Sequence, residues 1–164
     1  SGKMLQMLGL YQNHAIQMEM TTAGDLLNHV IDMEKEQAEK KAVHLKMECE
    51  AFSMKMDPAL MESLLVNLID NALKATDTDG SILVKAYETS GKKIFEVSDS
   101  GMGIPEEELG KITDAFYMVD KSRSRKEGGS GLGLALCVKV AEIHGGFLKI
   151  ESQPGEGTTV RAVF

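Results

Sequence analysis

The sequence is poor in several of the features that assign a protein to a class at first sight. Its two cysteines, Cys49 and Cys137, fall in an expected strand and an expected buried helix and lack the spacing of metal ligands. They are typical of reduced core residues, so we predict no disulfide. No run of about 18 apolar residues and no signal peptide is present, which predicts neither a membrane span nor an export signal.

Positive charge is also scarce, with 18 Lys and Arg against 25 Asp and Glu and a net charge of −7. A nucleic-acid-binding protein needs clustered Lys and Arg for phosphate contacts, so this balance argues against nucleic acid as a partner. A Walker A motif and a His-Arg-Asp triplet are both missing, which disfavours P-loop and eukaryotic-type kinases. The 164 residues, 43% apolar and 26% charged, are typical of one globular domain with a short appendage.

The most informative stretch is Asp99-Ser100-Gly101-Met102-Gly103-Ile104-Pro105, at the end of a predicted strand. Phe95 and Val97 alternate with polar residues, which places Asp99 on the apolar face. A buried carboxylate is costly without a donor, so we expect a donor to approach it. The glycines allow close backbone approach to a ligand, although an ordinary Asx turn also fits this pattern.

A polar stripe follows the helix predicted after Asp57-Pro58. Asn67, Asn71 and Lys74 are spaced at i, i+4 and i+7, so they share one helix face. A carboxamide oxygen is a suitable ligand for Mg²⁺, and a lysine one turn further on suits phosphate oxygens. The solvated side of an ordinary helix has the same appearance.

A glycine-rich run, Gly129-Ser130-Gly131-Leu132-Gly133, leads into a predicted apolar helix over residues 131–144. Backbone N–H groups at a helix N-terminus, free of neighbouring Cβ atoms, form an anion-binding site. A hinge or a tight entry turn is the alternative interpretation.

These three motifs, with Phe116-Tyr117 between the last two, occur in the order and rough spacing of one known domain. The chain resembles the catalytic, ATP-binding domain of bacterial sensor histidine kinases, in the GHKL superfamily, over about residues 22–164. With the predicted elements, this implies an α+β fold of the two-layer α/β sandwich type. A mixed, mostly antiparallel sheet would pack on helices at about residues 23–41, 58–75 and 131–144.

The resemblance also assigns roles in the site. Asp99 would accept a hydrogen bond from the adenine amino group, and Asn71 would bind Mg²⁺ with Asn67 assisting directly or through water. A polar, basic segment over residues 118–130 resembles the ATP lid, whose cations would be Lys121, Arg123, Arg125 and Lys126. The predicted ATP-binding residues are Asn67, Asn71, Lys74, Asp99, Gly101, Gly103, Ile104, Gly129, Ser130, Gly131, Leu132, Gly133 and Thr158.

Residues 1–20 carry an apolar seam at Met4, Leu8, Tyr11, Ala15 and Met18, which predicts a helix. In the resemblance this segment is the end of the dimerisation and phosphoacceptor hairpin, and residues 21–164 are the ATP-binding domain. The chain does not begin with Met, and we expect it to be part of a longer protein. Self-association through the N-terminal helix is a further expectation.

The phosphoacceptor box of sensor kinases is missing, because His14, His29, His44 and His144 all lack its context. The resemblance therefore implies the phosphoryl-donor half of a Mg-ATP-dependent autokinase that works in the cytoplasm. It is compatible with a parent protein that is anchored in the cell membrane. Its partners would be its own phosphoacceptor domain and the receiver domain of a response regulator.

Position 67 distinguishes the relatives within the superfamily. Topoisomerases, mismatch-repair ATPases, heat-shock chaperones and anti-sigma-factor kinases typically carry Glu there as a base, whereas this chain has Asn67. Little ATP hydrolysis is therefore expected. Two alternatives stay open: a nucleotide-gated interaction module without phosphotransfer, and a serine kinase of the anti-sigma-factor type.

Overall fold

The computed structural model describes residues 15–104, 106–108 and 133–164. Its elements are β1 (Glu19–Thr22), α2 (Ala23–Lys41), β2 (His44–Cys49), β3 (Ser53–Met56), α3 (Pro58–Ala75), β4 (Ser81–Thr89), β5 (Lys92–Asp99), η1 (Glu106–Glu108), α5 (Gly133–Ile143), β6 (Phe147–Gln153) and β7 (Gly157–Val163). Of the described helices, none is long and apolar enough to cross a membrane.

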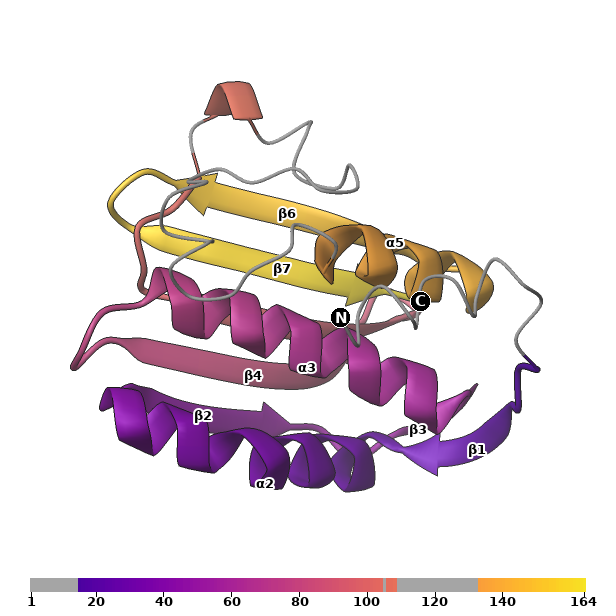
Figure 1. Cartoon of the computed structure of the whole chain (residues 1–164). Helices are drawn as coiled ribbons and strands as arrows, with labels where there is room; N and C mark the ends of the chain where they lie inside the picture. The colour runs from indigo at the N-terminus through magenta and orange to yellow at the C-terminus, as the bar shows by residue number, and fades with distance from the viewer. Residues whose placement is uncertain (1–14, 105, 109–132) are drawn as a thin grey trace.

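A five-stranded sheet with the order β2-β4-β5-β7-β6 forms one layer of the fold. β2 pairs with β4 in parallel, and the other three pairings are antiparallel. The helices α2, α3 and α5 cover one face of this sheet (Figure 1). The predicted two-layer α+β fold, with a mixed and mostly antiparallel sheet, is confirmed.

Local signals account for where the two long helices begin. The Thr22 side chain caps α2 by accepting a hydrogen bond from the backbone N–H of Asp25 at 3.1 Å. Asp57 caps α3 in the same way by accepting from Leu60, and Pro58 occupies the first helical position. Such caps satisfy backbone N–H groups that have no partner inside the helix.

The core lies between the helices and the sheet, as the alternation of the strands predicts. Phe95 on β5 is fully buried, with its ring centroid 5.7 Å from that of Phe52 and 6.2 Å from that of Phe164. Leu64 and Leu65 of α3 are fully buried in the same hydrophobic cluster. Burying such side chains removes apolar surface from water, which is the main driving force for joining the two layers.

The predicted N-terminal helix is wrong for its described part. Residues 15–18 have no regular secondary structure, and Glu19–Thr22 form β1, which pairs antiparallel with β3. The Asp57 carboxylate also accepts a hydrogen bond from the backbone N–H of Gln17 at 2.9 Å. These long-range partners outweigh the local helical periodicity. Residues 1–14 lie outside the described part, and the domain division at residue 20 stays a prediction.

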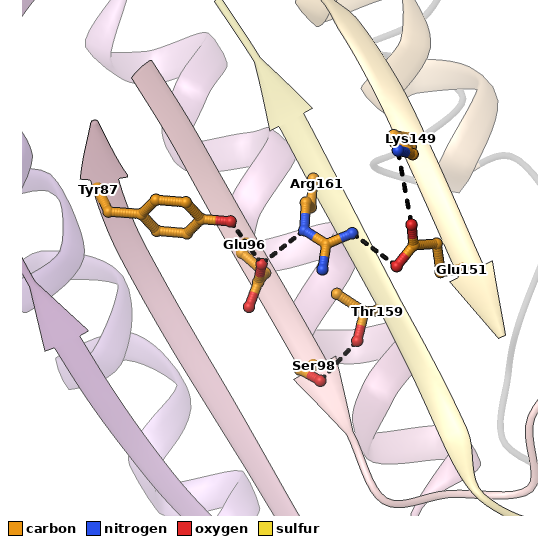
Figure 2. A network of polar contacts seen from close by, with 7 residues as sticks. All are labelled: Tyr87, Glu96, Ser98, Lys149, Glu151, Thr159 and Arg161. Atoms are coloured by element: carbon orange, nitrogen blue, oxygen red, sulfur yellow. Dashed lines mark hydrogen bonds and ion pairs between the residues drawn. The ribbon is translucent and has the colours of Figure 1, made fainter. Parts of the chain in front are cut away.

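The face of the sheet away from the helices carries a polar network (Figure 2). Glu96 on β5 is only 6% exposed, and its carboxylate accepts hydrogen bonds from the Tyr87 hydroxyl at 2.8 Å and from Arg161 Nε at 2.7 Å. Arg161 also donates to Glu151 at 2.8 Å. The guanidinium thus satisfies an almost fully buried carboxylate and holds three neighbouring strands together.

Replacing Arg161 with Met is expected to lower the free energy of unfolding by about 1–3 kcal/mol, because the buried Glu96 carboxylate loses its charged partner. The variant keeps an aliphatic stem over the sheet, so the effect reports the guanidinium. Urea denaturation measures it. Lys40→Met, at a solvent-exposed i,i+4 pair with Glu36, is the control and is expected to change stability by less than about 0.5 kcal/mol. Equal stabilities of the two variants would contradict the expected role of Arg161.

Candidate functional site

Asp99 is the last residue of β5 and lies opposite Thr158 of β7 in the sheet register. One carboxylate oxygen, Oδ1, accepts hydrogen bonds from the backbone N–H of Gly101 at 2.8 Å and of Thr158 at 3.3 Å. Neither bond uses Oδ2, and no described residue donates to that atom. Oδ2 is therefore available as an acceptor for a ligand.

Burial raises the pKa of the Asp99 carboxyl, and the hydrogen bonds from Gly101 and Thr158 offset part of that increase. A half-buried carboxylate without a cationic partner among its described contacts is the kind of group found at functional sites. The sequence placed Asp99 on the apolar face and predicted that a donor would approach it. The structure supplies two backbone donors, and among the described residues none donates to the second oxygen.

The loop after Asp99 is packed against the end of α3. The backbone N–H of Met102 donates to the carbonyl of Ala75 at 3.1 Å. A Cβ added at Gly101 would lie 2.3 Å from that same carbonyl oxygen. Only glycine permits this approach, which joins the Asp99 loop to the helix that carries Asn67, Asn71 and Lys74.

The hairpin β6–β7 forms the other side of this loop. Gly103 has φ +73°, and an added Cβ would lie 2.0 Å from the Gln153 carbonyl oxygen. The backbone N–H of Gly155 donates to the Met102 carbonyl at 2.7 Å, and that of Ile104 donates to Ser152 Oγ at 2.7 Å. Loop residues 101–104 are thus held between α3 and the β6–β7 hairpin.

Asn67 on α3 has an oxygen without a partner. The residue is 3% exposed, its Nδ2 donates to the Ser63 carbonyl at 2.7 Å, and its Oδ1 is buried and receives no hydrogen bond from any described residue. A buried polar oxygen without a donor is costly unless a ligand satisfies it. Asn71 and Lys74, one and two turns further on, are half-buried.

These carboxamides fit a magnesium ion that is carried in with phosphate. Within residues 15–104, 106–108 and 133–164, no three His, Cys, Asp or Glu side chains gather as a metal cluster. Mg²⁺ usually keeps several waters and takes one or two protein oxygens together with substrate phosphates. Asn67 Oδ1 and the side-chain oxygen of Asn71 are oxygens of that kind, and Asn67 Oδ1 still needs a partner.

The structure brings part of the predicted site together. Asp99, Gly101, Gly103, Ile104 and Thr158 meet at the strand ends, and Thr158 is 9% exposed there. Gly133 is buried as the first residue of α5. The remaining predicted positions lie outside the described residues: Phe116, Tyr117, Lys121, Arg123, Arg125, Lys126, Gly129, Ser130, Gly131 and Leu132.

Sequence reasoning missed Ser152. It lies on β6 with Oγ 2.7 Å from the Ile104 nitrogen and 2.7 Å from Thr158 Oγ1. A signal was present, because Leu148 and Ile150 alternate into the core and Ser152 is next on the same face. A serine at the position where this alternation predicts an apolar residue indicates a hydrogen-bond partner near the end of the strand.

Comparison with known proteins agrees with this geometry. Residues 56–164 match the family described as histidine kinase-, DNA gyrase B-, and HSP90-like ATPase. The chain belongs to this family. The match begins at Met56, just before α3, and covers all the predicted site residues, so the GHKL membership expected from the motifs is confirmed.

Its relatives in this ATPase family include sensor histidine kinases. The chain is 45% identical over 111 residues to the signal transduction histidine-protein kinase ArlS of Staphylococcus aureus strain USA300, a match that covers 68% of this chain and 25% of ArlS. The same figures hold for ArlS of strain COL. The chain thus spans about a quarter of the length of these curated relatives.

Solved structures with this fold are also histidine kinases. The nucleotide-free catalytic domain of histidine kinase ThkA superposes with a TM-score of 0.79 and 26% identity, covering 91% of this chain and 95% of that one. ThkA in complex with the response regulator TrrA gives a TM-score of 0.82 at 23% identity, covering 99% of this chain and 46% of that one, and shows the shared fold. The expected likeness to the catalytic domain of a sensor histidine kinase is confirmed.

Proposed function

We propose that this chain is the phosphoryl-donor domain of a two-component sensor histidine kinase. It binds ATP with Mg²⁺ and transfers the γ-phosphoryl group to a histidine outside this sequence. The observation that carries the proposal is Asp99, whose Oδ1 is held by two backbone N–H groups while Oδ2 stays open to the ligand. Membership of the ATPase family supports ATP as that ligand.

Asp99 recognises the base in this account. Its Oδ2 accepts from the exocyclic amino group of adenine, a charge-assisted bond worth about 1.5–3 kcal/mol. Ile104, held by Ser152, contributes apolar surface to the base, and Thr158 lies beside the carboxylate. The amino group of adenine thereby meets the Asp99 carboxylate, which the backbone bonds from Gly101 and Thr158 already hold in place.

The polar stripe of α3 holds the phosphates. Asn71 and Asn67 provide oxygens for Mg²⁺, which when bound neutralises phosphate charge, and Lys74 adds a cation two turns after Asn67. Positioning and charge neutralisation provide most of the catalysis of phosphoryl transfer. Position 67 lacks a carboxylate that would activate water, so the isolated domain hydrolyses ATP slowly.

The partners follow from the relatives. One solved structure holds the kinase ThkA in complex with a response regulator, and we propose the same class of partner for the protein that contains this chain. Its own phosphoacceptor domain supplies the histidine, dimerisation involves the N-terminal segment, and the domain works in the cytoplasm. Nucleic acid is not a partner.

The experiment has two stages. Calorimetry with Mg-ATP tests binding, and ATP radiolabelled at the γ-phosphate with the phosphoacceptor domain of a sensor kinase supplied in trans tests transfer to an acid-labile phosphohistidine. Binding and transfer are expected. Asn71→Leu removes the proposed oxygen ligand of Mg²⁺ with little change in side-chain size, and it is expected to retain the fold but lose transfer. Saturable binding without transfer to any acceptor would favour the nucleotide-gated interaction module, and no binding would overturn the proposal.

A further inference from the structure

The Ser152 hydroxyl lies within hydrogen-bonding distance of three groups. Ser152 is half-buried near the end of β6, on the face that meets the helices. Its Oγ lies 2.7 Å from the Ile104 nitrogen, 3.0 Å from the Gly157 carbonyl oxygen and 2.7 Å from Thr158 Oγ1. These three groups belong to the Asp99 loop and to the start of β7.

The chemistry of a hydroxyl decides which way these bonds run. A serine has one proton to donate and two lone pairs to accept with. The Ile104 N–H can only donate to Ser152, and the Gly157 carbonyl can only accept from it. The Ser152 hydroxyl therefore donates its proton to the Gly157 carbonyl oxygen. Its contact with Thr158 is then a hydrogen bond only if the Thr158 hydroxyl donates to Ser152 Oγ. This is the one assignment that makes all three contacts hydrogen bonds.

The consequence falls on the ligand side of Thr158. With its proton directed at Ser152, Thr158 Oγ1 offers only lone pairs to anything else. Thr158 lies opposite Asp99 in the strand register, so the two side chains lie on the same face of the sheet, next to the proposed site of the base. Both are then acceptors.

We propose that Ser152 is a positioning residue that sets the base selectivity of this pocket. By fixing Thr158 as an acceptor, it makes the pocket favour a purine that presents an amino group and reject one that presents a carbonyl oxygen at the same place. An oxygen that faces two acceptors leaves buried polar groups unpaired, and such mismatches discriminate strongly. The inference rests on the proposed binding of ATP.

The matched control is on the other side of the sheet. Ser98 Oγ on β5 lies 2.7 Å from Thr159 Oγ1 on β7, so this is another serine–threonine hydroxyl pair (Figure 2). Ser98 directly precedes Asp99 in the chain, and Thr159 directly follows Thr158. That pair faces away from the helices and the Asp99 loop. Ser98→Ala therefore removes the same chemistry without touching the pocket.

The test compares the dissociation constants of Mg-ATP and Mg-ITP, whose base carries a carbonyl in place of the amino group. In Ser152→Ala the Thr158 proton is released and able to donate to that carbonyl. ATP affinity is expected to fall about 3- to 10-fold, and the preference for ATP over ITP to narrow by at least about fivefold. Ser98→Ala is expected to leave both affinities unchanged. Equal losses for the two nucleotides would mean a purely structural role and overturn the proposal.

Thr158→Val provides a second route if Ser152→Ala folds poorly. It removes the hydroxyl with little change in shape, and it is expected to narrow the ATP preference as well. The double variant is expected to show no further narrowing, because both changes act on one hydroxyl. If the double variant narrowed the ATP preference by the product of the two single-variant factors, the link between the two residues would be contradicted. Failure of the unaltered chain to bind ATP would instead refute the proposed function, which keeps the two claims separate.

Discussion

Replacing Asp99 with Asn is expected to weaken Mg-ATP binding by about 100-fold or more. The variant loses a charge-assisted hydrogen bond, and its amide nitrogen would face the donor of the adenine amino group. The backbone bonds from Gly101 and Thr158 survive, because Asn keeps an oxygen for them to reach. Calorimetry with Mg-ATP measures the loss. Asp32→Asn, on the exposed side of α2, is the matched control and is expected to bind as tightly as the original chain.

The same variant is expected to be at least as stable as the original chain without nucleotide. Burial raises the pKa of the Asp99 carboxyl above its unfolded value, so the ionised form destabilises the fold at neutral pH. That penalty is present above the folded pKa and disappears as the pH falls through it. ATP affinity changes the other way, because acidification through this pKa removes the acceptor. Melting temperatures and ATP dissociation constants measured between pH 4 and 7 test the direction of both pH effects. An Asp99→Asn protein that melts at a lower temperature than the original chain yet binds ATP normally would contradict them.

Replacing Gly101 with Ala is expected to damage both the fold and the site. The added Cβ would lie 2.3 Å from the Ala75 carbonyl oxygen and 2.9 Å from Asp99 Oδ1. The first contact is with backbone at the end of α3, so the loop must move away and its bond from Met102 to Ala75 must lengthen. A loss of about 1–3 kcal/mol in the free energy of unfolding is expected, with a fall in ATP affinity of about 10-fold or more.

Gly24→Ala is the control for that variant. Gly24 lies in the first turn of α2, and an added Cβ would meet no atom within 4 Å. Alanine favours a helix by up to about 1 kcal/mol over glycine, so this change is expected to be neutral or stabilising and to leave ATP binding intact. Urea denaturation and calorimetry on both variants provide the comparison. A Gly101→Ala protein that matches Gly24→Ala in both measurements would show that the close approach to α3 is unimportant.

Much of the fold was accessible from the sequence because its signals are local. Asp57-Pro58 marks the start of α3, and the alternation that ends at Asp99 gives the face of β5 correctly. The strand at Glu19–Thr22 was not accessible, because its partner β3 lies 31 to 37 residues away in the chain. Asp57, which accepts from Gln17 just before this strand, is 40 residues from it. A short apolar periodicity in isolation cannot reveal a competing long-range pairing.

The site divides in the same way. Residue types and spacing marked Asp99, Asn71 and Lys74 as candidate site residues, but they did not indicate which oxygen of Asp99 is engaged by the backbone. The part played by Ser152 depends on contacts 48 residues away in sequence, with Ile104. The near-complete burial of Glu96 on the open face depends on Arg161, 65 residues away. Tertiary hydrogen bonds of this kind leave only faint traces in the local pattern.

The central claim is that a nucleotide binds to the Asp99 carboxylate and to the polar stripe of α3, and chemical-shift mapping by NMR tests it most directly. Mg-ATP titrated into the ¹⁵N-labelled chain is expected to shift the backbone amides of Gly101, Gly157 and Thr158 and the side-chain amides of Asn67 and Asn71. The amides of Glu96 and Arg161, on the opposite face, are expected to stay in place. Shifts confined to that opposite face, or no saturable shift at all, would contradict the account.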